Sequence, residues 1–178
     1  MKDFLLLMVG ALLSMAGASL AFEGAMVSMW SGNAIAVPNS YYSASYTKLL
    51  FPQVNYDTAG FWDGTINEFV VPSSIPHGTY GIISCHARWQ DTGGFRVQVL
   101  VAKYDASASV QLYSNFPESA PDNRLFTGGT TVDHASTTHP VLLEAGDRYS
   151  CQMWQQGSGE TSPALNVLQA GMSIYVVN

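Results

Sequence analysis

Charged side chains are scarce in this sequence. Asp, Glu, Lys and Arg make up only 11% of the 178 residues, about half of their usual share in soluble proteins. The basic residues form no cluster, and the formal net charge is −6. Because nucleic-acid binding needs a basic surface that contacts phosphates, this composition excludes that role. Either features other than charge keep the protein soluble, or partners cover much of its surface.

Cysteine is scarce as well, with only Cys85 and Cys151. The two residues form no short metal-binding pair, and they are compatible with one disulfide or with two buried thiols. The run RYSCQMWQ places Tyr149, Cys151 and Met153 on one face of a strand. We therefore expect Cys151 to be a core residue and not a reactive thiol.

The sequence also lacks the residue patterns of common catalytic sites. No G-x-S-x-G motif surrounds Ser84 or Ser150, and both fit polar positions on a strand. The acidic residues Asp57, Asp63 and Glu68 lie where turns and caps use such residues, so they do not indicate a carboxylate pair for glycoside cleavage. We predict that the protein is not an enzyme and that it uses no metal and no cofactor.

Histidine and tryptophan supply the remaining candidates for a site. His134 and His139 are five residues apart in a polar loop, which gives fewer ligands than the three or four that a metal site needs. His86 lies in a predicted strand, where we expect a lateral surface or interface position. Tryptophans can stack on the apolar faces of sugars, although core and interface positions explain each of them more simply. The four tryptophans are Trp30, Trp62, Trp89 and Trp154.

The N-terminus contains the longest apolar run. Residues 4–22 are nineteen uncharged residues in succession, which as a helix would span about 28 Å, close to the hydrocarbon thickness of a bilayer. A signal peptide is one interpretation, with Lys2 at its start and Ser19-Leu20-Ala21 as a cleavage site. A retained segment is the other, because Asp3 weakens the positive start that a signal peptide prefers.

Spacing favours the retained segment. Small residues recur at steps of four, three and four, which puts them on one stripe of a helix and lets neighbouring helices approach closely. We assign residues 1–31 to this segment and expect it to dock or bundle as an arm, with membrane anchoring as the less favoured use. The residues of the stripe are Gly10, Ser14, Gly17 and Ala21.

Beyond this segment the sequence changes to short alternating runs separated by Gly, Pro, Asn and Asp, which is typical of an all-β sandwich. We predict one sandwich domain over residues 32–178. Residues 91–94 are expected to form the turn of a hairpin, and residues 114–138 to form long connections. The predicted strands are Ala34–Val37, Tyr46–Phe51, Ile66–Val71, Thr79–Trp89, Phe95–Tyr104, Ser109–Tyr113, Pro140–Leu143, Arg148–Gln155 and Leu168–Val177.

The final run, LQAGMSIYVVN, is apolar on both faces. A strand that is buried on both sides needs a second cover. In a single sandwich the natural cover is another subunit, so we predict that the last strand lines the axis of a trimer. The predicted interface residues are Met172, Ile174, Tyr175 and Val177.

Three groups of residues are distinctive in their order and spacing. They are Tyr56-Asp57-Thr58 with Gly60 and Asp63, Pro72 with Gly78 and Tyr80, and Gly146-Asp147-Arg148. Together they resemble the globular head domain of complement component one q and its tumour-necrosis-factor-like relatives, in the stand-alone form found in bacteriophage structural proteins. The resemblance covers residues 32–177.

This resemblance implies a jelly roll of about ten strands that forms tight homotrimers and binds partners without catalysis. It also implies that residues 35–64 form the first hairpin region of the roll, with Tyr56 and Phe61 plugging its end. A collagen-like Gly-X-Y stalk is missing, so the antibody-binding role of complement is not supported. The acidic calcium ligands of some members have no match in this sequence.

Two functional hypotheses follow. The first is a homotrimeric virion protein that decorates or cements a bacteriophage capsid or forms a short head fibre, with the major capsid protein or another virion protein as partner. The second is a secreted or surface-anchored module that binds a glycan or a protein receptor, and a receptor-binding tail protein lies between the two. The low charge, the apolar N-terminal segment and the phage-type residue order favour the first. A mature chain that starts at Phe22 would favour the second.

Overall fold

The computed structural model describes residues 23–30, 34–39, 46–90, 96–105, 110–114, 131–156 and 164–177. Within these ranges the chain forms thirteen β-strands, all of them in two antiparallel sheets, and no helix. The predicted all-β sandwich is confirmed. The predicted N-terminal helix or arm, with its stripe of small residues, lies outside the described ranges.

The first sheet, called sheet A below, has seven strands. Two short strands extend its main path, β11 (Val141–Leu142) beside β7 and β2 (Ile35–Val37) beside β13. The main path consists, in order across the sheet, of β10 (Thr131–Thr137), β7 (Tyr80–Gln90), β13 (Leu165–Val177), β1 (Gly24–Met29) and β4 (Gln53–Asp57).

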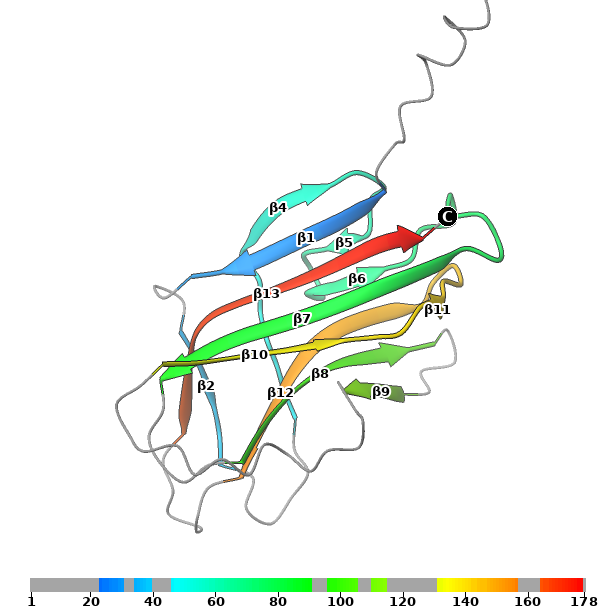
Figure 1. Cartoon of the computed structure of the whole chain (residues 1–178). Coiled ribbons are helices and arrows are strands. Elements are labelled where there is room, and N and C mark those ends of the chain that lie inside the picture. Colours follow the sequence, from blue (N-terminus) through cyan, green and yellow to red (C-terminus); the bar gives the residue numbers. More distant parts are fainter. Residues whose placement is uncertain are drawn as a thin grey trace, which may run out of the picture.

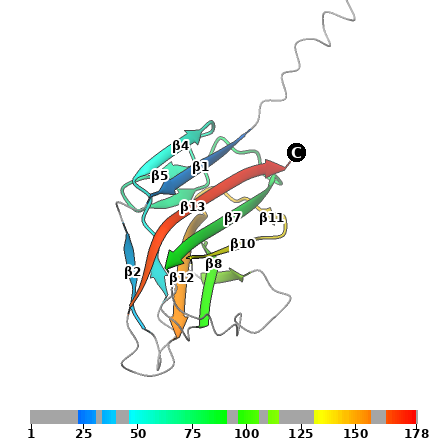
Figure 2. The same ribbon diagram turned by 60° about the vertical axis from the view of Figure 1, so that its left-hand side comes forward.

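The second sheet, called sheet B, has six strands. The short strand β3 (Thr47–Lys48) pairs with β12 at the side of its main path. That path consists of β5 (Trp62–Asp63), β6 (Glu68–Val70), β12 (Arg148–Gln156), β8 (Arg96–Tyr104) and β9 (Val110–Ser114). Strands β12 and β8 pass behind the strands of sheet A in both Figure 1 and Figure 2, so the two sheets form two layers.

The core lies between the two layers and is built by alternation along the strands. Strand β7 buries every second residue, among them Ile83, Ala87 and Trp89, and exposes most of the others. Strand β12 contributes Tyr149 and Met153, both fully buried, on the face that the sequence predicted. The alternating apolar residues of the longest strands therefore specify which face of each sheet points inward.

A disulfide joins the two layers. Cys85 on β7 and Cys151 on β12 are bonded, their Cα atoms are 5.5 Å apart, and both residues are fully buried. The sequence left open whether these cysteines pair, and the structure shows that they do. The prediction that Cys151 belongs to the core is confirmed.

The sandwich begins earlier than the predicted boundary at residue 32. Strand β1 pairs with β13 on one side and with β4 on the other, so it lies inside sheet A. Its residues Ala25, Val27 and Met29 enter the core. This alternation directly follows the apolar residues 4–22, and for that reason it did not appear as a separate strand in the sequence.

Strands β10 and β4 were also absent from the predicted set, β10 because its residues were assigned to a long connection. Residues 131–137 form β10, although their Ser, Thr and Asp content is typical of a loop. Strand β4 was also missed, because its first three residues are exposed. Both strands lie at edges of sheet A, where one side of the strand has no partner strand among the described residues and polar side chains are common. The predicted strand 46–51 is reduced to β3.

The path of the chain between the layers also differs from the prediction. Strands β7 and β8 were expected to form a hairpin, but they lie in different sheets. Phe61 is fully buried in the core, in agreement with its predicted role as a plug. Tyr56 does not plug the sandwich, since it pairs with Met26 on the outer face of sheet A.

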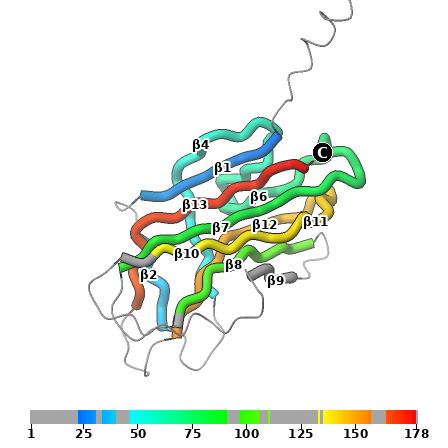
Figure 3. Tube along the Cα trace, in the orientation of Figure 1, coloured from blue at the N-terminus to red at the C-terminus, as the bar shows by residue number. Residues whose placement is uncertain are grey.

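The two ends of the described chain meet at one end of sheet A (Figure 3). Gly24 pairs with Tyr175, and the backbone N–H of Val176 donates a hydrogen bond of 3.0 Å to the carbonyl oxygen of Glu23. The start of β1 and the end of β13 therefore lie side by side. This end of the sheet carries the first candidate surface.

Candidate functional sites

The outer face of sheet A holds two of the four predicted interface residues. Tyr175 and Val177 lie on this face, partly exposed and exposed respectively. Met172 and Ile174 are 1% and 0% exposed and belong to the core of their own chain. They are not available to another subunit, because sheet B already covers that face of β13. The prediction of an interface is therefore kept for Tyr175 and Val177 and corrected for the other two.

Apolar side chains gather at the end of this outer face where the chain enters β1 and leaves β13. Tyr80 and Val177 are opposite each other on β7 and β13, and they are 48% and 41% exposed. Ile82 and Tyr175 form the next pair inward. We call this group the apolar end of sheet A, and its members are Tyr80, Ile82, Val177, Tyr175, Met26 and Tyr56.

A pair of tyrosines links three strands within the apolar end. Burial, together with a hydrogen bond with the side chain of Tyr175, raises the pKa of Tyr56 to about 12. Tyr56 comes from β4 and Tyr175 from β13, with β1 between them. The two hydroxyl groups therefore satisfy each other on a surface that is otherwise apolar.

The remainder of the same face is polar and hydrogen-bonded within itself. Arg88 on β7 makes a bidentate ion pair with Asp133 on β10, with N–O distances of 2.7 and 2.8 Å. The same guanidinium donates to the side-chain oxygen of Gln169 at 3.3 Å. Hydrogen bonds from Arg88 hold the pKa of Asp133 below its usual range, so this carboxylate stays ionised at neutral pH.

His86 lies at the centre of this polar part, on β7 opposite Gly171 of β13. Its ring covers Gly171 so closely that a Cβ atom at residue 171 would lie 2.9 Å from Nε2 and 3.1 Å from Nδ1. Burial of the ring lowers the pKa of His86, while the nearby carboxylate of Asp133 opposes the shift. Ser28 follows in the same row on β1, and its hydroxyl oxygen is buried without a hydrogen-bond partner among the described residues.

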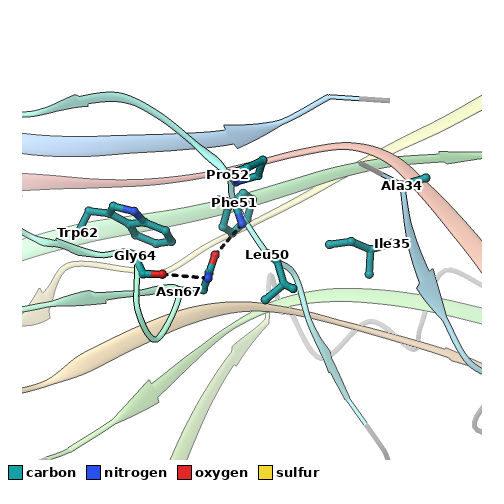
Figure 4. A pocket seen from close by; sticks show the side chains of 8 residues that line it. All are labelled: Ala34, Ile35, Leu50, Phe51, Pro52, Trp62, Gly64 and Asn67. Carbon is teal, nitrogen blue, oxygen red and sulfur yellow. Dashed lines mark hydrogen bonds between the residues drawn. The ribbon is translucent and has the colours of Figure 1, made fainter. Parts of the chain in front are cut away.

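The second candidate site is a pocket of about 550 Å³ at the edge of the sandwich. Figure 4 shows that its walls come from three segments: the start of β2, the stretch just before β4, and the β5–β6 turn. None of its lining residues carries a charge. They are Ala34, Ile35, Leu50, Phe51, Pro52, Trp62, Gly64 and Asn67.

Two polar side chains hold the walls of this pocket in place. The amide oxygen of Asn67 accepts the backbone N–H of Phe51 at 2.8 Å, and its amide nitrogen donates to the carbonyl of Gly64 at 3.3 Å. Asn67 has φ of 55°, a left-handed conformation that Asn tolerates better than most residues. Asp57 accepts backbone N–H groups from the four residues 59–62, at 2.8 to 3.3 Å.

Trp62 is therefore positioned from two sides. Its backbone is fixed by Asp57, and its ring makes edge contacts with Phe51 and Phe69 at centroid distances of 6.2 and 5.6 Å. The indole N–H has no hydrogen-bond partner within the described part of the chain. Gly64 leaves space beside it, because a Cβ atom there would lie 3.3 Å from Nε1. The pocket thus offers one free donor in an apolar lining.

The other residues considered from the sequence have structural contacts. Ser84 bonds Thr137 across two strands at 3.0 Å, and Ser150 accepts the amide of Gln152 at 3.1 Å. Asp63 binds Thr65, whose hydroxyl and N–H lower the pKa of Asp63. Glu68 is buried between Lys48, at 2.7 Å, and Arg148, at 3.3 Å. Each of these side chains supports a turn or a sheet.

The histidine pair and the tryptophans are distributed over the molecule. His134 lies opposite Ala87 in the β10–β7 register, but its side chain is outside the described part, and His139 is exposed. Trp89 is a core residue. Trp30 is 58% exposed, and its indole N–H donates a hydrogen bond of 3.0 Å to the side-chain oxygen of Gln53. Among the side chains that the structure describes, no group of three metal-ligating residues comes together. Nor does that part of the chain contain a helix that could cross a membrane.

No family model matches the chain, and no curated protein matches its sequence. Its structure is similar to the globular domain of zebrafish complement 1qA protein, with 10% identity and a TM-score of 0.54, over 88% of this chain and 98% of that one. It is also similar to the Eiger TNF from S. frugiperda, with 10% identity and a TM-score of 0.51, over 88% of this chain and 93% of that one. These similarities concern the fold, and they confirm the predicted jelly roll.

Proposed function

We propose that this chain is the subunit of a non-enzymatic homotrimeric binding module. The observation that carries the proposal is the apolar end of sheet A, where six side chains of four adjacent strands form an uncharged group on an outer face. Solvent-facing sheet surfaces are normally polar. A contiguous apolar group of this kind is typical of a contact surface.

The proposed number of three subunits rests on the sequence resemblance described above and on the jelly-roll fold. The family that the sequence resembles forms tight homotrimers, and the jelly roll is the fold on which those trimers are built. Three identical subunits also give a physical reason for binding without high affinity at any single site. Once one subunit is bound, the others encounter their targets at a high effective concentration, so that weak contacts combine into firm attachment.

This proposal is compatible with two places where the protein could act, the virion and the outside of the cell. The virion role that we predicted is one, with the capsid as the bound surface. Export from the cell is the other, with a glycan or receptor as the ligand. The buried Cys85–Cys151 disulfide favours export, because disulfides persist in oxidising compartments and are rare in the cytosol. A signal peptide within residues 4–22 is consistent with the same interpretation.

Sedimentation equilibrium tests the assembly. We expect a trimer for the wild-type protein at low micromolar concentration and dissociation for Tyr175→Asp, because an unpaired buried charge costs several kcal/mol. The matched control is Val110→Asp, which places the same charge on an exposed residue of sheet B. A wild-type monomer, or a Tyr175→Asp protein that remains trimeric, would contradict the proposed interface. The N-terminal residue, determined by mass spectrometry, separates the two locations.

A further inference from the structure

We propose that the edge pocket binds a small uncharged molecule with an apolar body and one hydrogen-bond acceptor. This inference deepens the proposed function, since it names a site and a ligand class for the binding module. Its volume of about 550 Å³ lies in the range of small-molecule sites. The argument rests on three properties of the pocket: its position, its lining and its single free donor.

The position of the pocket is independent of the apolar end of sheet A. The pocket is formed by the start of β2, residues 50–52 and the β5–β6 turn (Figure 4), whereas the apolar end is built from β1, β4, β7 and β13. No residue belongs to both groups. Binding in the pocket therefore does not require the face that we assign to subunit contact.

The lining excludes most classes of ligand. Its described residues include no acidic, basic or histidine side chain, so a charged ligand would lose its hydration without gaining a partner among them. A sugar needs several hydrogen bonds, but apart from the indole N–H of Trp62 the described lining has one polar side chain, Asn67, which already bonds Phe51 and Gly64. Leu50, which is 51% exposed at this site, adds further apolar surface. An apolar body is the class that remains.

The indole N–H of Trp62 determines which polar group the ligand should carry. The indole N–H of Trp62 has no partner in the described part of the chain, and the missing side chain of Gly64 keeps the space beside it open. An acceptor oxygen on the ligand would satisfy this donor. Asp57 and the two aromatic neighbours fix the ring beforehand, so its orientation does not have to be imposed by the ligand.

The test uses the full-length protein and three probes of similar size, titrated by ligand-observed NMR. Acetophenone combines an aromatic body with one carbonyl acceptor, toluene lacks the acceptor, and benzoate carries a charge. We expect acetophenone to bind about five-fold more tightly than toluene, which is the net effect of one hydrogen bond. Benzoate should not bind measurably. Equal binding of benzoate and acetophenone, or no binding of acetophenone at any concentration tested, would overturn the proposal.

One variant isolates the donor. Trp62→Phe keeps an aromatic ring in the wall but removes the N–H, so the preference for acetophenone over toluene should disappear while toluene still binds. Trp30→Phe is the matched control, because it removes an exposed indole that does not line the pocket. A preference that persists in Trp62→Phe would show that the acceptor is recognised elsewhere, and would refute the assignment.

Sedimentation of the same samples separates this inference from the proposed function. A trimer that binds no probe contradicts the pocket assignment and leaves the assembly intact. A monomer that binds acetophenone with the expected preference supports the pocket and contradicts the trimer. The two proposals can therefore fail independently.

Discussion

The imidazole ring of His86 lies over Gly171 on the neighbouring strand of sheet A. Any side chain at residue 171 would occupy the space of the ring, since a Cβ atom would lie within 3.1 Å of both ring nitrogens. Glycine in a strand interior costs some stability but permits such an approach. The arrangement removes one face of the ring from water and explains the lowered pKa of His86.

Substitution of Gly171 should therefore mainly change the position and the pKa of the His86 ring. In Gly171→Ala we expect the ring of His86 to turn into solvent and its pKa to rise towards the ordinary value of 6.5. The free energy of unfolding should change by less than about 1 kcal/mol, because the loss of ring packing is offset by the smaller entropy of the unfolded chain. NMR titration of the histidines measures the shift. Ser173→Ala on the same strand face is the control and should leave the His86 titration unchanged.

Stability should depend on pH through the same residue. Since the pKa of His86 is lower in the folded protein than in the unfolded chain, the unfolded chain binds the proton first as the pH falls. The contribution of neutral His86 is complete above about pH 6.5 and is lost as the pH falls through the folded-state pKa. Urea midpoints between about pH 4 and 8 should show a smaller decrease for His86→Gln than for the wild type. His77→Gln, an exposed histidine outside sheet A, is the control.

Asp133 gives a sharper form of this pH prediction. Its carboxylate raises the pKa of His86, against the larger effect of burial. In Asp133→Asn that contribution is removed and Arg88 loses its ion-pair partner, so the pKa of His86 should fall further. An increase of this pKa in Asp133→Asn would contradict the arrangement of the three side chains.

The hydroxyl pair in the apolar end should be visible in a tyrosine titration. With a pKa of about 12, Tyr56 ionises later than ordinary tyrosines, and the stability of its protonated form is lost as the pH rises from about 10 to 12. Tyr175→Phe removes the hydrogen bond, so the late phase of the absorbance titration at alkaline pH should move to lower pH. Tyr80→Phe, at the exposed rim of the same group, should leave that phase in place.

Part of this molecule follows directly from its sequence. The alternation in β12 predicted its core residues Tyr149, Cys151 and Met153, and the motif around Asp57 pointed to the jelly roll. The missed strands had weaker patterns, because β1 follows a continuous apolar run and β10 is polar. The last strand was judged apolar on two equivalent faces, yet sheet B covers Met172 and Ile174. Local alternation indicates two faces but does not reveal which of them another part of the same chain covers.

The candidate sites were harder to predict for a similar reason. The pocket draws its walls from residues 34–35, 50–52 and 62–67, and no local pattern links these segments. The left-handed Asn67 beside Gly64 was the available signal, since Asn and Gly are typical of a tight turn. His86 lies on the exposed face of β7, as expected, but its contact with Gly171 could not be predicted, because it depends on the register between β7 and β13. Such a register is set by the whole sheet.

The carboxylate of Asp57 connects the fold to the pocket. It accepts the backbone N–H groups of four residues that lead into Trp62. In Asp57→Ala these donors lose their acceptor, so we expect the protein to lose about 1 to 3 kcal/mol of stability. The affinity for acetophenone should also fall, since Trp62 is no longer positioned. The control is Asp63→Ala, whose carboxylate binds Thr65 in an exposed turn and should cost less.

The Cys85–Cys151 disulfide leads to a prediction about stability. The bonded residues are 66 positions apart, so the bond restricts the unfolded chain over a long loop, an effect of about 2 to 4 kcal/mol. Addition of a reducing agent should lower the urea midpoint of the wild-type protein by a corresponding amount. The double variant Cys85→Ala, Cys151→Ala should have a low midpoint that reducing agent does not change. A wild-type midpoint that is insensitive to reduction would contradict a stabilising bond.

The same disulfide discriminates between the two proposed locations. Bacteriophage particles assemble in the host cytoplasm, where thiols are kept reduced, whereas an exported protein is oxidised. Protein taken directly from its source, unfolded without reducing agent and treated with a thiol reagent, should show no reactive cysteine if the module is exported. Two reactive cysteines per chain would show that Cys85 and Cys151 remain reduced in that source, and would favour the virion role over export. Because both residues are fully buried, the reagent must be added after unfolding, and a reduced and unfolded sample provides the reference value for complete reaction.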